Sequence, residues 1–403
     1  MLLTLWTLWG CGASLDGAST PTPPPPDARP GEAPDDEPVD EMAMLQALGY
    51  ADYVDPSGEG DGDGVVVHDA AKAWTSPTLI TVRPRREALL VDVDGTVLHR
   101  WTYDQRGVWE RATLLPDGDL LAIGAYDTKR GMRRSLARLA PDGTVRWDQT
   151  LDVHHDVTMA PDGRLSALVL EFRDIGRRRP VRDDCIAFLD PATGVEAERR
   201  CFYDMIVARP EVFPMKEVRA LRTNGDSPHY DIFHTNAIHW IHDDALQSAF
   251  AEWKKGRVLI CFRHQDRVAL FDLEAGEVVW AWGADELEGP HDAQILPNGH
   301  VLIFDNGLKR KWSRVIEVDP ATNEIVWSYT APNKGDFFTL SRGSNQRLPN
   351  GNTLITSSEQ AAVFEVTPEG EVVWRWRLPL AEGEKRLPSL IRGYRVDAGV
   401  LPH

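Results

Sequence analysis

Five side chains that could bind or attack an anion lie near the starts or ends of apolar stretches in this chain. His155 and His291 each lie six residues before the proline of a Pro-Asp-Gly or Pro-Asn-Gly turn. His234 and Asn236 open another apolar stretch, and Arg263 directly follows a further apolar run. These positions are far apart in sequence, so they can act together only in a fold that brings separate strands to one place.

The chemistry of this set favours a negatively charged ligand. Three imidazoles, an amide and a guanidinium offer many hydrogen-bond donors and few acceptors, which suits a tetrahedral oxyanion ester. A neutral imidazole can also act as a nucleophile near pH 7. A histidine followed by aspartate could instead hold neighbouring repeats together. His154 rather than His155 could point inward, because neighbours along a strand face opposite sides.

A metal site is the other interpretation of the three imidazoles, since zinc sites with three histidine ligands occur. The positive charge of Arg263 would oppose a bound cation. We therefore expect no metal and no cofactor, and we keep a metal-dependent hydrolase as an alternative.

A repeated unit of about 47 residues accounts for most of the chain from residue 76 onward. Each unit has an apolar strand, a turn, and a strand that usually ends in Trp. The turn residues advance by 48, 51, 82, 47 and 47 positions, at Gly95, Gly143, Gly194, Gly276, Asn323 and Gly370. Strands of period two with glycine turns argue against a helical solenoid of similar period. We predict an all-β fold, a six-bladed β-propeller with four-stranded blades, over residues 76–403.

Two departures from the regular repeat concern the closure of the ring and an insertion. The first unit lacks an inner strand before Thr78, and residues 387–396 could supply it, which would remove open sheet edges. The step of 82 positions carries about 35 extra residues. They include residues 205–231 and a predicted helical stretch at 243–255. The insertion leads into His234, so we expect a lid or a wall of the site.

Three segments precede the repeats. Residues 1–11 resemble a lipoprotein-type signal segment that is cleaved before a lipidated Cys11, with a disordered apolar N-terminus as the alternative. Residues 12–40, rich in proline and acidic side chains, are predicted to be a disordered tether. Residues 41–75 are predicted to hold a short helix and a lead-in. This order predicts a bacterial periplasmic or cell-envelope protein, held at the membrane only by the lipid on Cys11.

The formal charge of −18 is unevenly distributed. Residues 1–64 hold 13 acidic residues and one basic residue, a net −12, which leaves −6 for the remainder. A mildly acidic body predicts no nucleic-acid partner.

The cysteines after residue 11 divide into a candidate pair and a core residue. Cys185 and Cys201 lie eight residues on either side of Thr193 in a predicted hairpin. That symmetry allows a cross-strand disulfide in an oxidising compartment, while two reduced buried thiols remain the alternative. Cys261 lies in an apolar strand, as a core residue would.

Local motifs around the candidate site together resemble the arylsulfate sulfotransferase family. They are Phe233-His234-Thr235-Asn236, Phe262-Arg263-His264-Gln265-Asp266, Pro290-His291-Asp292-Ala293-Gln294-Ile295-Leu296-Pro297-Asn298-Gly299 and Phe304-Asp305-Asn306-Gly307. They occur in the family's order, and the resemblance extends over most of residues 78–396. It implies a periplasmic six-bladed propeller that moves a sulfuryl group from an aryl sulfate to a phenol through a sulfohistidine, independently of the nucleotide donor PAPS.

The resemblance also implies roles for the site residues. His291 would be the nucleophile, His234, Asn236 and Arg263 would hold the sulfuryl oxygens, and His155 would be a further histidine of the site. The implied partners are a small aryl sulfate and a phenol. A non-catalytic anchored propeller that binds an anionic ligand is the alternative from a different functional class.

Overall fold

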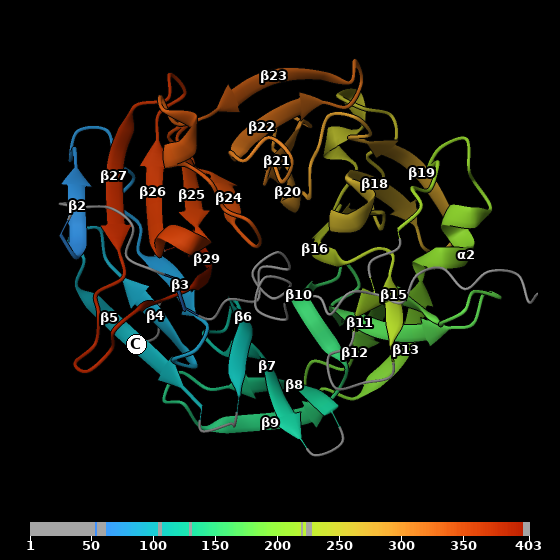
Figure 1. Ribbon diagram of the computed structural model, residues 1–403, viewed down its shortest axis with the longest axis horizontal. Coiled ribbons are helices and arrows are strands. Elements are labelled where there is room, and N and C mark those ends of the chain that lie inside the picture. Colours follow the sequence, from blue (N-terminus) through green and yellow to red (C-terminus); the bar gives the residue numbers. More distant parts are fainter. Residues whose placement is uncertain are drawn as a thin grey trace, which may run out of the picture.

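Figure 1 shows the computed structural model of the chain as a ring of small sheets around a central axis. The structure describes residues 53–54, 62–103, 107–128, 131–218, 221–222 and 228–397. Within these residues, six antiparallel sheets of at least four strands each form the blades, which confirms the predicted six-bladed all-β propeller. The expected signal segment, Cys11, the tether and the N-terminal helix fall outside the described residues.

Each blade runs from an innermost strand at the axis to an outermost strand at the rim. From the axis outward, blade 1 holds β29 (Leu390–Arg395), β3 (Thr78–Val82), β4 (Glu87–Val91) and β5 (Val97–Thr102), and blade 2 holds β6 (Val108–Leu114), β7 (Leu120–Thr128), β8 (Gly131–Leu139) and β9 (Val145–Thr150). Blade 3 holds β10 (Val153–Met159), β11 (Leu165–Arg173), β12 (Val181–Leu189) and β13 (Glu196–Cys201), and blade 4 holds β16 (Thr235–Trp240), β17 (Val258–Phe262), β18 (Arg267–Asp272) and β19 (Glu277–Trp282). Blade 5 holds β20 (His291–Ile295), β21 (Val301–Asp305), β22 (Arg314–Asp319) and β23 (Glu324–Tyr329), and blade 6 holds β24 (Ser344–Arg347), β25 (Thr353–Ser357), β26 (Ala362–Val366) and β27 (Val372–Arg377). Short 3₁₀ turns are η1 (Ala245–Ser248), η2 (Arg263–Gln265), η3 (Lys334–Asp336) and η4 (Ser358–Gln360).

The hydrophobic core lies between the blades. Middle strands such as β3, β4, β17 and β18 are buried on both faces because blades cover them on each side, and they read as apolar runs. Outer-strand tryptophans bind the next blade through their indole N–H. Trp147, Trp327 and Trp374 donate to the carbonyl oxygens of Pro191, Pro368 and Val93 at 3.1, 2.7 and 2.7 Å. The repeated tryptophans therefore join blades, as their position in the sequence pattern indicated.

Both ends of the described chain close the ring at the same place. Strand β29 pairs with β3 and supplies the inner strand that the first repeat lacks, as expected. Strand β2 (Gly64–His68) pairs with β27 as an additional outer strand of blade 6, although the sequence suggested only a lead-in there. A two-residue strand β1 (Tyr53–Val54) also pairs with β28 (Leu387–Pro388).

The insertion after blade 3 forms a wall between blades 3 and 4. Helix α2 (Phe202–Val207) buries Phe202 and Ile206 in a cluster with Phe262 and Phe271 of blade 4. The insertion ends in β15 (His229–Asp231), which runs parallel to β12 and pairs with β14 (Leu221–Arg222).

The predicted helix at 243–255 was wrong, because only the short η1 turn forms there. Asp244 explains the difference: its carboxylate accepts the backbone N–H of Lys255 at 2.8 Å and a side-chain N–H of Gln247. These bonds fold the segment into turns instead of a regular helix. Among the described residues, no helix is long and apolar enough to span a membrane.

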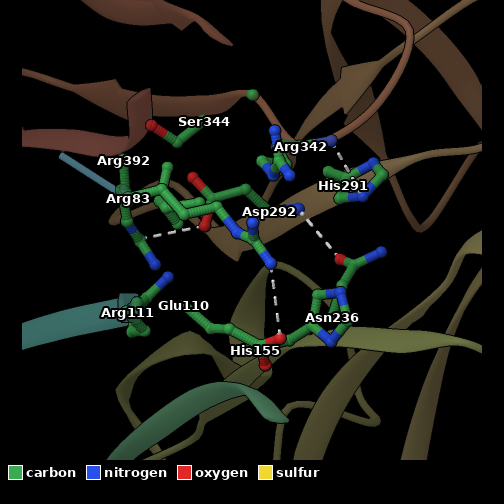
Figure 2. A pocket seen from close by; sticks show the side chains of 12 residues that line it. Arg83, Glu110, Arg111, His155, Asn236, His291, Asp292, Arg342, Ser344 and Arg392 are labelled. Carbon is green, nitrogen blue, oxygen red and sulfur yellow. Dashed lines mark hydrogen bonds and ion pairs between the residues drawn. The ribbon is translucent and has the colours of Figure 1, made fainter. Parts of the chain in front are cut away.

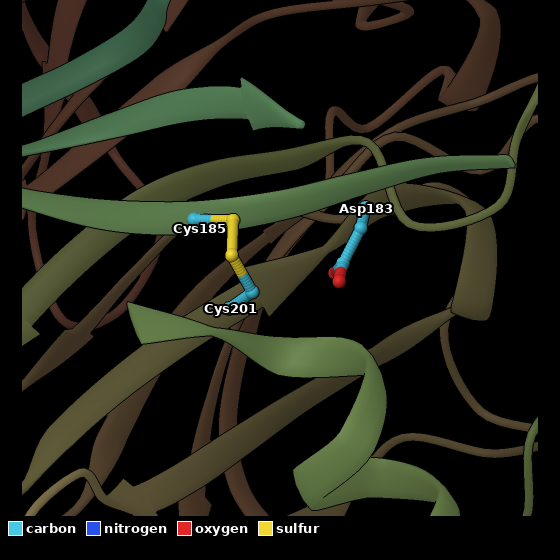
Figure 3. Close-up of side chains that lie close together, drawn as sticks. All are labelled: Asp183, Cys185 and Cys201. Atoms are coloured by element: carbon cyan, nitrogen blue, oxygen red, sulfur yellow. A yellow bond between two sulfur atoms is a disulfide. The ribbon is translucent and has the colours of Figure 1, made fainter. Parts of the chain in front are cut away.

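Figure 3 shows Cys185 and Cys201 joined by a disulfide between adjacent strands β12 and β13. The two cysteines are directly opposed in the strand register. Asp183, two residues earlier, is buried, and that burial raises the pKa of its carboxyl to about 7. Cys261 is a free, buried cysteine in the core between blades 4 and 5.

Candidate functional site

The innermost strands of four adjacent blades have a left-handed residue at or near their start. The φ angle is 55° at His155, 51° at His234, 48° at Asp292 and 61° at Arg342. Non-glycine residues rarely adopt this conformation, and those that do cluster at functional sites. In blades 3, 4 and 5 the strand register also shifts at this position. Such bulges re-aim consecutive side chains, so one can face the central axis while the next reaches a neighbouring blade.

Side chains next to these positions link the blades into a continuous belt. Asp156 of blade 3 accepts the Ile238 N–H of blade 4 at 2.9 Å. Asn236 accepts the Asp292 N–H of blade 5 at 3.3 Å, and Asp292 accepts the Asn345 N–H of blade 6 at 2.9 Å. The aspartates of the two His-Asp pairs therefore hold adjacent blades together. The histidines that precede them are left to face the axis.

A cavity of about 50 Å³ is lined by residues from every blade of the described ring. That volume is several times the space that a water molecule needs. His155, Asn236 and His291 lie on one side of the cavity in Figure 2, while Arg111 and Arg392 lie on the other. Three of the five residues named from the sequence therefore meet in one cavity.

His234 and Arg263 stand one step behind this surface, since neither is among the described residues that line it. The His234 ring packs edge-on against that of His155, with ring centroids 4.9 Å apart. Arg263 is buried, and its positive charge acts on His291. His154, the alternative inward residue, is buried against Arg182 and Asp184 instead.

The hydrogen bonds of Asn306 fix the tautomer of His291. The Asn306 amide nitrogen donates to the carbonyl oxygens of Thr339 and Arg342, at 2.8 and 3.0 Å. Its Oδ1 atom must therefore accept, and it lies 2.7 Å from His291 Nδ1. His291 accordingly carries its proton on Nδ1. The lone pair is on Nε2, which, within the described part of the chain, accepts a long contact of 3.3 Å from the Arg342 N–H.

Burial lowers the pKa of His291 to about 3, and the charge of Arg263 is the next largest cause in the same direction. Burial likewise holds the pKa of His155 well below its ordinary value, helped by His234 and His154. Both imidazoles are therefore neutral at pH 7. A neutral, buried imidazole whose Nε2 lone pair accepts only weakly is a nucleophile that needs no prior deprotonation.

Asp231, the last residue of β15, orients His234. Its Oδ2 atom accepts the His234 Nδ1–H at 2.6 Å and lies 3.3 Å from Arg182 Nη1. Burial alone would raise the pKa of Asp231, but the charges of Arg182, His234 and His264 hold it well below the ordinary value. Because the ionised carboxylate binds Nδ1, the Nε2 atom of His234 points away from Asp231.

Asp231, His234 and His264 lie close enough together to hold a metal ion in geometric terms. Several of their ligand atoms are already committed to the protein, however. His264 Nδ1 donates to the Asp231 carbonyl at 2.6 Å, and its Nε2 accepts from Arg263 Nη1 at 2.9 Å. Two guanidiniums, Arg182 and Arg263, also adjoin the group and oppose a cation. The donor set fits an anion site better than a metal site.

Four further arginines that the sequence did not single out line the cavity: Arg83, Arg111, Arg342 and Arg392, from blades 1, 2 and 6. Arg342 adjoins His291, whereas Arg111 and Arg392 lie across the cavity from it. None lies in a recurring motif, and each belongs to a different local context. A signal was present only in Arg392, which lies in the segment that was expected to form the inner strand of blade 1.

Comparison with known proteins gives one family match. The family model described as Arylsulfotransferase (ASST) matches residues 132–378, more than half of the chain. That range includes His155, His234, Asn236, Arg263 and His291. None of the curated protein sequences matches significantly.

Several solved structures are similar in part. A protein of unknown function from Bacteroides caccae is 14% identical, with 79% of this chain and 100% of that chain covered and a TM-score of 0.48. A streptogramin B lyase is 11% identical, with 82% and 87% covered and a TM-score of 0.44. A catalytically inactive virginiamycin B lyase from Staphylococcus aureus with quinupristin is 11% identical, with 79% and 89% covered and a TM-score of 0.42. At these identities, none of these likenesses assigns a reaction to this chain.

Proposed function

This chain belongs to the arylsulfotransferase (ASST) family, and from that premise we propose that it moves a sulfuryl group from an aryl sulfate to a phenol through a sulfohistidine at His291. The observation that carries the proposal is the tautomer of His291. Asn306 holds the proton on Nδ1, so the Nε2 lone pair of a neutral imidazole is available beside the central cavity.

The reaction takes place in two displacements. His291 Nε2 attacks the sulfur of the donor, the sulfur–oxygen bond to the aryl group breaks, and a phenolate leaves. The oxygen of the acceptor phenol then attacks the same sulfur, and the sulfur–nitrogen bond breaks to restore neutral His291. The proton that the acceptor loses balances the one that the released phenolate gains, so neither a cofactor nor a nucleotide donor is required.

The remaining site residues stabilise the transferring group. Sulfuryl transfer, like phosphoryl transfer, passes through a loose transition state with charge on three equatorial oxygens. Donors held in place before the reaction lower its barrier. We assign the direct contact to Asn236, whose amide is fixed by Pro290 O at 2.9 Å, with His155 beside it. Arg263 and His234, one step behind the surface, would stabilise the developing charge from there.

We also propose that the protein works in the bacterial periplasm or cell envelope, anchored by a lipid on Cys11. The cross-strand disulfide Cys185–Cys201 supports an oxidising compartment, since such bonds persist there and are rare in reducing ones. Labelling of cells with a radioactive fatty acid tests the anchor: Cys11→Ala should abolish incorporation, and equal labelling of both forms would contradict it.

Incubation with a chromogenic aryl sulfate in the absence of a phenol should leave one SO₃ group on His291. The reason is that the second displacement needs an acceptor, so the intermediate accumulates. Peptide mass spectrometry locates the adduct, and added phenol should remove it. Anion binding with no adduct and no phenol release would favour the non-catalytic alternative.

The first displacement should be nearly independent of pH between 5 and 8 as far as His291 is concerned. Burial holds its pKa at about 3, so the nucleophile stays neutral throughout this range and is lost only as the pH approaches 3. An ordinary histidine would be about 90% protonated at pH 5.5, which would lower the rate about tenfold. The burst rate of phenol release, measured across pH, distinguishes the two. A tenfold fall by pH 5.5 would contradict the assigned state of His291.

Asn306→Ala should lower kcat by about 10- to 100-fold with little change in KM, because the imidazole loses its fixed tautomer and orientation. Asn306 acts through His291, so it is a positioning residue. Asn352→Ala is the matched control, since Asn352 is also buried but bonds to Glu365 outside the cavity. Equal loss of activity in both variants would indicate a structural role for Asn306.

A further inference from the structure

We propose that Arg111 and Arg392 form a second anion subsite in the central cavity, and that the aryl substrate carries a second negatively charged group besides its sulfate. The identity of the substrate as an aryl sulfate rests on the proposed function, but the subsite does not. The two arginines project from the innermost strands β6 and β29, and both line the cavity.

The two guanidiniums hold like charges close together in a buried place. The exposed fraction is 10% for the Arg111 side chain and 15% for that of Arg392. They lie side by side in Figure 2, and after burial the charge of Arg392 is the largest influence that lowers the pKa of Arg111. An anion that binds between them would relieve this repulsion, which is strong where water is excluded.

Each arginine has a carboxylate partner, but that carboxylate is shared. Asp156 pairs with Arg111 at 2.7 Å through Oδ1, while its Oδ2 accepts the Ile238 N–H. Asp292 pairs with Arg392 at 3.0 Å through Oδ1, while its Oδ2 accepts the Asn345 N–H. Neither carboxylate can therefore form the two-pronged pair that a guanidinium prefers.

Donor capacity remains on these two guanidiniums. A guanidinium has five N–H groups, and one ion pair uses only part of them. The Arg392 Nε–H is buried and has no hydrogen-bond partner within the described part of the chain. A buried donor without a partner is costly, and a bound anion would satisfy it.

The surrounding charges add to this imbalance. Arg83 and Arg134 both approach Glu110, at 3.9 and 3.8 Å, so two guanidiniums share one carboxylate at this side of the cavity. At these distances Glu110 forms no close two-pronged pair with either guanidinium on this arginine side of the cavity.

The arginine side is separate from the side that we assign to the transferring sulfuryl group. His291 and Asn236 lie across the cavity from Arg111 and Arg392 in Figure 2. Arg83, Arg111 and Arg392 also fall outside residues 132–378, the range that the family model matches. The substrate class that would contact both sides is an aromatic ring with a sulfate at one position and a carboxylate, sulfonate or second sulfate at another. The central cavity of about 50 Å³ is smaller than such a ligand, so the ligand would extend into the neighbouring cavity of about 250 Å³, which Arg111 and Arg392 also line.

Binding of unreactive sulfonates tests the subsite without any turnover. Isothermal titration of the full chain should give a Kd for benzene-1,3-disulfonate that is about tenfold or more below that for benzenesulfonate. The ratio should fall as salt is raised, because ion pairs are screened. A wild-type ratio near one would overturn the proposal.

Variants of the two arginines give the residue-level test. Arg111→Gln and Arg392→Gln should each bring the ratio of the two dissociation constants close to one. The matched control is Arg347→Gln, because Arg347 is also on an innermost strand and pairs with a carboxylate, Glu317, but lies outside the cavity. If Arg392→Gln does not fold, Arg392→Lys serves instead. It keeps the charge next to Asp292 and should lose part of the preference.

The outcomes separate this proposal from the proposed function. Preference for the disulfonate that depends on Arg392, without any turnover of aryl sulfates, would support the subsite and contradict the sulfotransferase. Turnover of aryl sulfates without such a preference would support the sulfotransferase and contradict the subsite. Loss of preference in Arg347→Gln to the same extent as in Arg392→Gln would also overturn the subsite, since it would show a general loss of charge.

Discussion

Replacement of His291 by alanine is expected to lower the turnover of an aryl sulfate in the presence of a phenol by a factor of about 10⁴ or more. The imidazole is the only group that we assign to accept the sulfuryl, and removal of a covalent nucleophile leaves only the stabilising donors around it. Release of the chromophore, compared between wild type and variant at equal concentration, gives the effect directly.

His300→Ala is the matched control for this variant. His300 is bound to Glu317 at 2.7 Å and does not line the cavity, so turnover should stay within a few fold of wild type. Circular dichroism and the melting temperature show whether each variant folds. Retention of more than a tenth of the activity in folded His291→Ala would reject His291 as the nucleophile.

Arg263→Gln is expected to lower kcat by about 10²- to 10³-fold and to change KM much less. A positive charge held close to negative charge that develops during the reaction contributes mainly to the transition state. Arg263 also lowers the pKa of His291, so its loss should move the acid limb of the burst rate toward higher pH. A purely structural role would not shift that limb.

Arg267→Gln provides the comparison, because Arg267 is in the same blade but stacks on Phe213, away from the cavity. It should leave both kcat and the acid limb near their wild-type values. A larger effect on KM than on kcat in Arg263→Gln would mean that the arginine holds the ground state instead.

The architecture could be predicted from the sequence because it depends on local patterns that recur in every repeat. Turn residues such as Gly143 and Gly370 recur at nearly constant spacing, and each needs the left-handed backbone that glycine adopts easily. The closing strand at 390–395 could be predicted because an open sheet edge had to be covered. Strand β2 could not, since its register depends on the edge that β27 presents.

The site was predictable only as far as its residues stand in motifs. His155, Asn236 and His291 meet in one cavity because each lies near the start of an innermost strand. Arg111 and Asp231 do not stand in a recurring motif. The position of Arg111 depends on contacts between blades, and that of Asp231 depends on an insertion of irregular length. The tautomer of His291 depends on Asn306 of the next strand, which no spacing rule specifies.

The position of β29 has a consequence for how the protein matures. Arg392 lies on the strand nearest the carboxyl end of the described chain, whereas its partner Asp292 adjoins His291. During synthesis on the ribosome, the central cavity therefore stays incomplete until residue 392 has emerged. Pairings of such long sequence separation form slowly, so a nascent or truncated chain should remain inert and exposed to proteases for longer than a protein built from local contacts.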